Sequence, residues 1–504
     1  MTDIARSCGI LLHPTSLPGA RGVGAIGRWA RRFVDRLAEA GQSWWQILPL
    51  NPPGFGGSPY AADSAFAGNP YLTDLTDLVD RGWLDEEAVV ELEEAVADQP
   101  ADRYDIGRVN RLRGALLRRA HANWRSADRP QGEDFEAFCA EQKSWLEDYA
   151  LFEAIKEDQG GEDWRDWPAP LVARQPAALE AAGKRLSRSV ERVQFKQWVF
   201  DRQWRELRDY AAERGVRLIG DAPIFVAMDS ADAWAHREIF KVDEMGEPEV
   251  VAGVPPDYFS ETGQKWGNPV YDWETLAESD YGWWLDRLDR LAETVDLVRI
   301  DHFRGFDAHW EVPTEAPTAE TGEWVDGPGG DFFDAVLEEF DELPFIAEDL
   351  GTITQSVERL RDRYALPGMK VMQFAFDGSD DHPFLPHTYP ENCVAYTGTH
   401  DNNTTLGWYE EETDAGTRHQ VRNYLMASDD EVLWSMIEAI TESDARLTVF
   451  PVQDILQLGA EARMNVPGTE TDNWNWRMTA DQLDDDGWER LAALVRQTGR
   501  NRRG

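Results

Sequence analysis

Cysteine is rare in this 504-residue chain, which contains three, at Cys8, Cys139 and Cys393. They are odd in number and far apart, and no two form a Cys-x-x-Cys motif. The sequence therefore contains neither a disulfide framework nor a thiolate metal motif, which is typical of proteins from a reducing compartment. It also has no His-Glu-x-x-His motif, and no glycine-rich phosphate loop follows the first predicted strand.

Long apolar segments are absent as well. No run reaches the roughly 18 apolar residues that a membrane-spanning helix needs. At the N-terminus, the apolar segment 8–13 is short and stops at His-Pro, so it does not have the pattern of a signal peptide. We therefore expect a soluble, cytoplasmic protein without a membrane partner.

Positive charge is scarce. Against 94 Asp and Glu there are 50 Lys and Arg, of which only seven are lysines, and the net charge is −44. Nucleic acids and anionic membranes are unlikely partners, because binding phosphate requires a basic patch. Acid-rich, lysine-poor chains are typical of high-salt cytoplasm, where screening removes the repulsion between the acids. The composition therefore predicts a halophilic protein.

Apolar and aromatic residues are plentiful, with 42% hydrophobic residues and 22 tryptophans. That is ample for a core, and some of the aromatics in loops also suit stacking against sugar rings. Apolar segments typical of buried strands alternate with amphipathic helices along the chain. The predicted strands are 9–13, 43–50, 216–221, 296–301, 344–348, 370–376, 393–397 and 448–452.

Eight short strands alternating with helices favour the α/β class, as a parallel (β/α)8 TIM barrel with large, mainly helical insertions. A doubly wound open sheet is the alternative. We expect one catalytic domain over 1–504, with a helical insertion subdomain at 75–200 and no room for a C-terminal β-sandwich. One long loop, which includes 54–60 and 64–71, is expected to be functional, because loops of this length without secondary structure usually are. The predicted helices are 28–40, 85–97, 109–124, 134–157, 187–214, 281–294, 331–340, 353–364, 431–443 and 485–496.

Four of the predicted strands lead into a carboxylate: Asp221, Asp301, Glu348 and Asp401. In a TIM barrel such residues meet at the C-terminal face, where active sites lie. Carboxylates without a metal motif favour glycosyl chemistry, in which one attacks the anomeric carbon and another donates a proton. A structural ion pair at a strand end is the competing interpretation for a single such strand.

Arg299 lies two residues before Asp301 on the same face of a strand, so it is expected to keep Asp301 ionised. The apolar residues before Glu348 predict a raised pKa through desolvation. Asp401 would be a third carboxylate that binds sugar hydroxyls. His302 and His400 lie beside acids and could bind a metal. Histidines in such surroundings more often hydrogen-bond a polar substrate, so we expect no metal and no cofactor.

Several long strings carry a resemblance to a known family. They are His-Pro-Thr-Ser-Leu-Pro-Gly at 13–19, Ser-Pro-Tyr at 58–60, and the segments 64–71, 221–226, 254–269, 299–305, 347–351 and 397–402. With these strings the sequence resembles the 4-α-glucanotransferases, or amylomaltases, of glycoside hydrolase family 77, which relate to the α-amylase superfamily. The match covers nearly the whole chain. It departs at Gly57 and Asn403, where the family often has Asp.

The resemblance implies that Asp301 is the nucleophile, Glu348 the acid/base and Asp401 the transition-state stabiliser. It implies an active-site loop at 251–270. It also implies α-1,4-glucans and maltooligosaccharides as substrates and glucose as an acceptor. A retaining α-glucan hydrolase is the alternative, and a non-catalytic glucan-binding protein is a third hypothesis. The residues expected to contact substrate are Tyr60, Asp221, Tyr258, Gln264, Trp266, Arg299, His302, His400 and Asn402.

Overall fold

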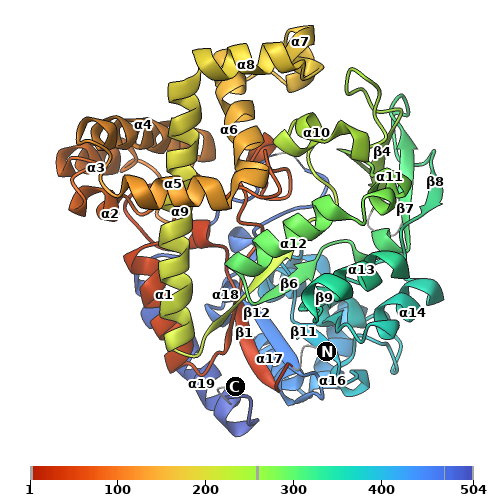
Figure 1. Cartoon of the computed structure of the whole chain (residues 1–504). Coiled ribbons are helices and arrows are strands. Elements are labelled where there is room, and N and C mark those ends of the chain that lie inside the picture. The colour runs from red at the N-terminus through yellow and green to blue at the C-terminus, as the bar shows by residue number, and fades with distance from the viewer. Residues whose placement is uncertain (1–3, 257–259, 470, 502–504) are drawn as a thin grey trace.

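A closed barrel forms the centre of the computed structural model, which describes residues 4–256, 260–469 and 471–501 (Figure 1). In this described part, eight parallel strands close in the order β1-β12-β11-β10-β9-β6-β3-β2. Every residue of β1, β6, β11 and β12 is buried, because side chains fill the barrel and helices cover it. The strands are β1 (Ser7–Leu11), β2 (Trp44–Gln46), β3 (Arg217–Ala222), β6 (Leu297–Ile300), β9 (Phe345–Ala347), β10 (Gly368–Val371), β11 (Cys393–Tyr396) and β12 (Leu447–Pro451).

Each barrel strand overlaps one of the eight predicted strands, so the predicted TIM barrel is confirmed. The sixth is displaced, because β10 ends at Val371 and Met372–Ala375 form a turn of 3₁₀ helix. The run 371–376 is apolar except for Gln373 and is almost wholly buried, so its composition does not reveal where strand pairing stops. Beyond β12, the described residues 452–469 and 471–501 form helices and loops, without a β-sandwich.

Helices cover the barrel between its strands. Phe33 of the first of them packs edge-on against Trp45 of β2, with ring centroids 5.1 Å apart. These helices are α1 (Arg28–Glu39), α10 (Ala231–Ala235), α11 (Trp273–Glu278), α12 (Gly282–Thr294), α13 (Gly330–Phe340), α14 (Gln355–Arg363), α15 (Thr405–Gly407), α16 (Ala415–Leu425), α17 (Val432–Glu442), α18 (Val452–Ile455) and α19 (Asp486–Gln497). Within the described residues, we find no helix whose length and hydropathy suit a membrane span.

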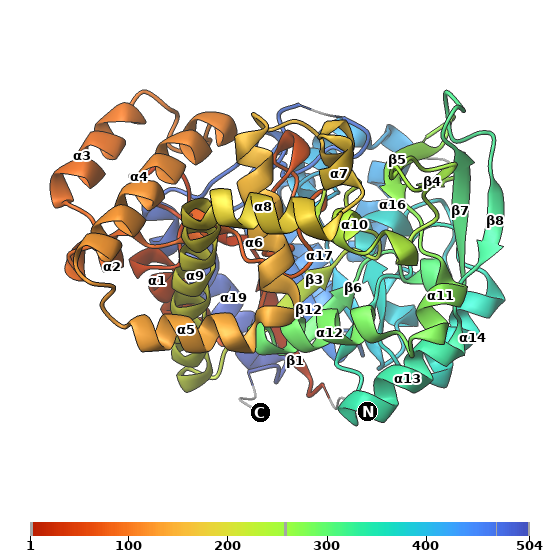
Figure 2. The ribbon, with the colours of Figure 1, turned by 45° about the horizontal axis from the view of Figure 1, so that its top comes forward.

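A helical insertion lies to one side of the barrel, coloured orange to yellow in Figures 1 and 2. Its last helix, α9, returns the chain to the barrel, so the predicted limit at residue 200 falls inside a helix. The single helix predicted at 134–157 is wrong. Two helices meet at Gln142, whose buried side chain accepts from Trp145 Nε1 at 2.7 Å and donates to Glu293. The helices are α2 (Leu75–Asp80), α3 (Glu86–Ala95), α4 (Ile106–Ser126), α5 (Gly132–Glu141), α6 (Lys143–Asp158), α7 (Ala169–Val172), α8 (Pro176–Arg185) and α9 (Ser187–Glu213).

A second, antiparallel sheet is absent from the sequence prediction. Its strands pair in the order β5-β4-β7-β8. The predicted active-site loop, 251–270, therefore contains two paired strands. Sequence periodicity misses them because β5 reads Gln-Lys-Trp-Gly-Asn-Pro, without apolar alternation. The four strands are β4 (Val250–Val254), β5 (Gln264–Pro269), β7 (Ala308–Pro313) and β8 (Glu323–Asp326).

Candidate active site

Three of the predicted carboxylates lie at the ends of adjacent barrel strands. Asp221 is in β3, Asp301 follows β6 and Glu348 follows β9. Arg299 of β6 pairs in register with Asp221. Its Nη1 donates to Asp221 Oδ2 at 2.8 Å and lies 2.9 Å from Asp301 Oδ1. The Asp301 side chain is 28% exposed, whereas that of Asp221 is fully buried. Of the two acids that Arg299 holds, Asp301 is therefore the one that a substrate can reach.

Glu348 has a different environment. Backbone N–H groups of His302 and Leu350 donate to its Oε2 at 2.8 Å and to its Oε1 at 3.0 Å. Burial raises the pKa of Glu348 to about 8, with a further contribution from the negative charge of Asp301, while Arg299 opposes both. This is the direction that the apolar strand before Glu348 predicts. A carboxyl group with this pKa is mostly protonated at neutral pH and can donate a proton.

Tyr60 extends from the loop after β2 into this group. Its hydroxyl donates to Asp221 Oδ2 at 2.9 Å. Its ring stacks on His400 with centroids 5.2 Å apart and lies 5.8 Å from the ring of Trp474. Burial lowers the pKa of His400 and favours its neutral form. The structure thus brings Tyr60, Asp221 and His400 together, as expected for residues around one site.

Asp401 follows β11 in a turn, and two residues from a distant segment hold it. Asn465 Nδ2 donates to its Oδ1 at 2.7 Å, and Arg463 Nη2 donates to its backbone carbonyl at 2.9 Å. His400 Nε2 lies 3.3 Å from the other carboxylate oxygen. The sequence does not predict Asn465, Arg463 or Trp474 as site residues, because they lie in a segment with no strand or helix pattern that would direct them to the site.

His302 adopts the left-handed backbone conformation, with φ of 51°, immediately after Asp301. Burial lowers its pKa to about 3, so the imidazole is neutral. The Trp266 ring meets His302 edge-on with centroids 4.9 Å apart, and its Nε1 donates to Gln264 Oε1 at 3.2 Å. Trp266 therefore lies beside His302 and is hydrogen-bonded to Gln264, whereas Tyr258 lies outside the described residues.

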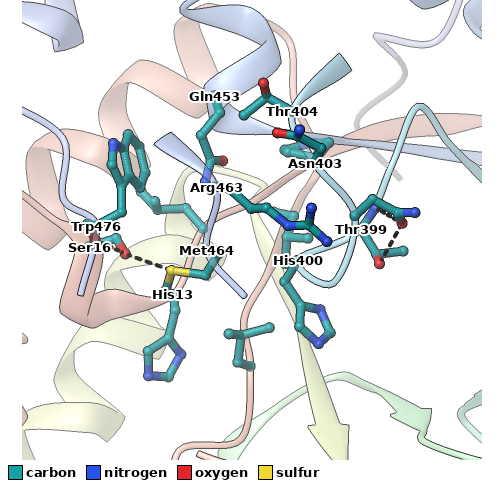
Figure 3. Close-up of a pocket in the computed structure, with 15 residues that line it drawn as sticks. His13, Ser16, Thr399, His400, Asn403, Thr404, Gln453, Arg463, Met464 and Trp476 are labelled. Carbon is teal, nitrogen blue, oxygen red and sulfur yellow. Dashed lines mark hydrogen bonds between the residues drawn. The ribbon is translucent and has the colours of Figure 1, made fainter. Parts of the chain in front are cut away.

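Asn402 has a structural contact in the turn that contains Asp401. Its Oδ1 accepts hydrogen bonds from the N–H of Thr399 at 2.9 Å and from the Thr399 hydroxyl at 3.0 Å. Behind this turn is a small cavity of about 30 Å³, which His13 and His400 line among others (Figure 3). That volume suits one water molecule and not a sugar ring.

The side chains of this site can transfer protons. Among the residues that the structure describes, no group of three or more His, Cys, Asp or Glu side chains is arranged to hold a metal ion. The site combines a reachable carboxylate held by a guanidinium with a carboxylic acid of raised pKa. At the C-terminal face of a barrel, these features define an enzyme of the class that makes and breaks glycosidic bonds through carboxylates.

Comparison with known proteins identifies the family. Residues 12–483 match the model of glycoside hydrolase family 77, described as 4-alpha-glucanotransferase. The chain is 49% identical to the 4-alpha-glucanotransferase of Thermus thermophilus, over 99% of this chain and 100% of that protein. It is 48% identical to that of Synechocystis, over 95% of each. The chain therefore belongs to the 4-alpha-glucanotransferase family, which confirms the resemblance seen in its sequence.

A solved structure agrees with this assignment. The amylomaltase from Streptococcus agalactiae in complex with acarbose superposes on this chain with a TM-score of 0.95 at 36% identity. The superposition covers 98% of this chain and 99% of that one. The agreement extends over the barrel and its insertions together.

Proposed function

We propose that this enzyme transfers a segment of an α-1,4-glucan to the 4-hydroxyl of an acceptor by a retaining double displacement. Maltooligosaccharides and longer α-1,4-glucans are the donors, and glucose or another glucan is the acceptor. One observation carries the mechanism. Two unlike carboxyl groups end the paired strands β6 and β9: Asp301, partly exposed and held by Arg299, and Glu348, buried with a pKa of about 8.

In the first step, an Asp301 carboxylate oxygen attacks the anomeric carbon of the donor. The bond from that carbon to the glycosidic oxygen breaks, and Glu348 transfers its proton to the leaving 4-oxygen. The product is a glycosyl ester on Asp301. We assign the stabilisation of positive charge on the sugar to Asp401, which Asn465 and His400 hold in position.

In the second step, Glu348 acts as a base. It removes the proton from the acceptor 4-hydroxyl, whose oxygen attacks the anomeric carbon and displaces Asp301. The new bond has the same anomeric configuration as the bond that was broken, and both carboxyl groups return to their starting states. We assign the binding of the acceptor to Trp266 and Gln264, beside the neutral His302.

A retaining α-glucan hydrolase would use the same first step, with water as the acceptor in the second. Incubation with maltotriose distinguishes them. A transferase produces glucose together with maltooligosaccharides longer than maltotriose, and the total number of reducing ends stays constant. A hydrolase produces glucose and maltose and increases the number of reducing ends, and that outcome would reject transfer as the main reaction.

The covalent intermediate can be tested directly. A 2-fluoro maltosyl donor with a good leaving group should accumulate as a glycosyl ester, because fluorine slows both steps and the good leaving group speeds only the first. We expect mass spectrometry of the digested protein to find the label on the peptide that contains Asp301. A label on Glu348 or Asp401 instead would assign the nucleophile differently.

A further inference from the structure

Residues of α6 of the insertion and of α10 and α12 line a second cavity. Figures 1 and 2 show where these three helices lie. The volume of the cavity is about 240 Å³. None of the candidate catalytic or substrate-contact residues lines it. The helices around it come from the barrel and from the insertion, and Ser64 and Phe66 of the loop after β2 complete the wall.

The floor of this cavity is aromatic and buried. Phe66, Trp145, Tyr149 and Trp283 are each less than a tenth exposed. Phe66 stacks on Trp145 at 6.4 Å and meets Trp283 edge-on at 5.6 Å, so the rings support one another. The floor also contains a buried carboxyl group, that of Asp232, whose Oδ2 accepts from Ala65 N–H at 2.7 Å. Aromatic faces with a few polar groups are the usual lining of a small-molecule site.

The mouth of the cavity is exposed and polar. It contains the side chains of Ser144, Glu238, Ser279 and Asp286. No lysine or arginine lines the cavity among the described residues. The one imidazole in the described lining, His236, lies 3.7 Å from Glu238 Oε1 and is outnumbered by the acids of the cavity, which disfavours phosphates and other anions. The carboxyl and hydroxyl groups can hydrogen-bond a ligand that has hydroxyl groups.

The charges beside the aromatic floor disfavour a cation there. The guanidinium of Arg287 lies over the Trp283 ring at 5.7 Å, and that of Arg290 over the Trp145 ring at 5.4 Å. Each indole thus already has a cation beside it, and a second one would be repelled. Asp148, which also lines the wall, is paired with Arg174 at 2.6 Å. Burial raises the pKa of Asp232, which weakens it as a fixed negative charge.

We propose that this cavity is a non-catalytic binding site for one neutral hexose unit, either free glucose or the end unit of a glucan. The apolar face of a pyranose ring suits the aromatic floor, and its hydroxyl groups suit Asp232 and the polar mouth. Binding at this site is independent of the roles of Asp301 and Glu348, and it would place a second sugar on the enzyme beside the insertion.

Gly282 offers a way to fill the cavity. It lines the wall, and a Cβ atom added there would meet no other atom within 4 Å. The Cβ of Gly282→Leu is therefore free of clashes, and the rest of the side chain is expected to occupy part of the cavity. The matched control is Gly183→Leu in α8, where an added Cβ also meets nothing within 4 Å and which does not line the cavity.

The test is the stoichiometry of glucose binding to the full-length protein, measured by calorimetry and by crystals soaked in glucose. Glucose alone gives no turnover, because no donor is present. We expect glucose density in the cavity of wild type and of Gly183→Leu. We expect Gly282→Leu to bind one equivalent less and to have an empty cavity.

Equal glucose stoichiometry in all three proteins, with an empty cavity in the wild-type crystal, would overturn the proposal. So would binding of tetramethylammonium in the cavity in preference to glucose, because the site would then select a cation. If Gly282→Leu does not fold, Ser144→Trp at the exposed mouth serves as the second blocking variant, and the wild-type crystal still locates or excludes the sugar.

Discussion

At the scale of single residues, substitution of the proposed nucleophile is the most direct test of the mechanism. Asp301→Asn should abolish transfer, because an amide cannot displace the glycosidic oxygen, while the ladder hydrogen bond from its backbone N–H to Ala222 remains. A variant that keeps more than about a tenth of the wild-type rate has lost under about 1.4 kcal/mol of transition-state stabilisation. That result would rule out Asp301 as the nucleophile. The measurement is the initial rate on maltotriose beside a thermal melt.

Asp326→Asn is the matched control for this substitution. Asp326 is an exposed residue of β8 in the antiparallel sheet. The substitution removes one negative charge, as Asp301→Asn does, and leaves the carboxylates of the site unchanged. We expect its rate on maltotriose to stay within about twofold of wild type, because exposed substitutions away from a site change stability by only about 0.5 kcal/mol.

The pKa of Glu348 predicts how the activity depends on pH. The first step needs Glu348 protonated, and its pKa is about 8, above the ordinary value for Glu. Activity should therefore fall as the pH rises through about 8. Glu348→Gln should lower kcat on glucans by roughly 10²- to 10⁴-fold, the usual value of general acid catalysis. With an activated donor the variant should still form the glycosyl ester, without the fall near pH 8. If that fall persists in the variant, another group causes it.

At the scale of elements, two paired strands set the distance between the catalytic groups. β6 and β9 are hydrogen-bonded neighbours, and paired strands lie about 4.8 Å apart. We therefore expect the Asp301 and Glu348 carboxyl groups to lie within roughly 5–5.5 Å in a complex with a glucan, which is the spacing of a retaining mechanism. A crystal structure of that complex with a separation of about 9 Å would contradict retention.

The hairpin of β4 and β5 places Trp266 beside His302, with 39% of the residue exposed. An exposed indole beside a site is well suited to stack on an incoming sugar. Trp266→Ala should raise the KM for the glucose acceptor several-fold and change formation of the glycosyl ester little. Trp324→Ala is the control, because Trp324 is 40% exposed on β8 of the same sheet. Equal effects of the two variants would argue against an acceptor role for Trp266.

At the scale of the whole molecule, the formal charge of −44 dominates. Exposed acids stand close together on the surface, as on the outer side of α3 at Glu86, Glu87, Glu91 and Glu94. At about 0.01 M ionic strength the screening length is about 30 Å, and near 1 M it is about 3 Å. Unfolding separates like charges, so low salt should favour the unfolded chain.

We therefore expect the melting temperature and the activity to rise steeply as KCl increases from tens of millimolar to molar concentration. A second salt at equal ionic strength should have a similar effect if screening is the cause. A melting temperature that stays flat or falls over that range would reject adaptation to high salt.

The sequence by itself determined the barrel and the acids. Each barrel strand is a short apolar segment between amphipathic helices, and that local pattern is visible without the fold. Because parallel strands in a barrel all point the same way, a carboxylate after each of several strands must lie at one end. Asp221, Asp301 and Glu348 could therefore be placed together from their positions along the chain.

The tertiary structure alone decided what surrounds those acids. The contact of Asn465 with Asp401 joins residues 64 positions apart, and no local pattern encodes it. The antiparallel sheet was hidden because β5 has no apolar alternation and is held by its partner β4. The cavity between α6, α10 and α12 exists only where the insertion meets the barrel. Such features depend on packing between distant segments, whereas strands and helices follow from the order of neighbouring residues.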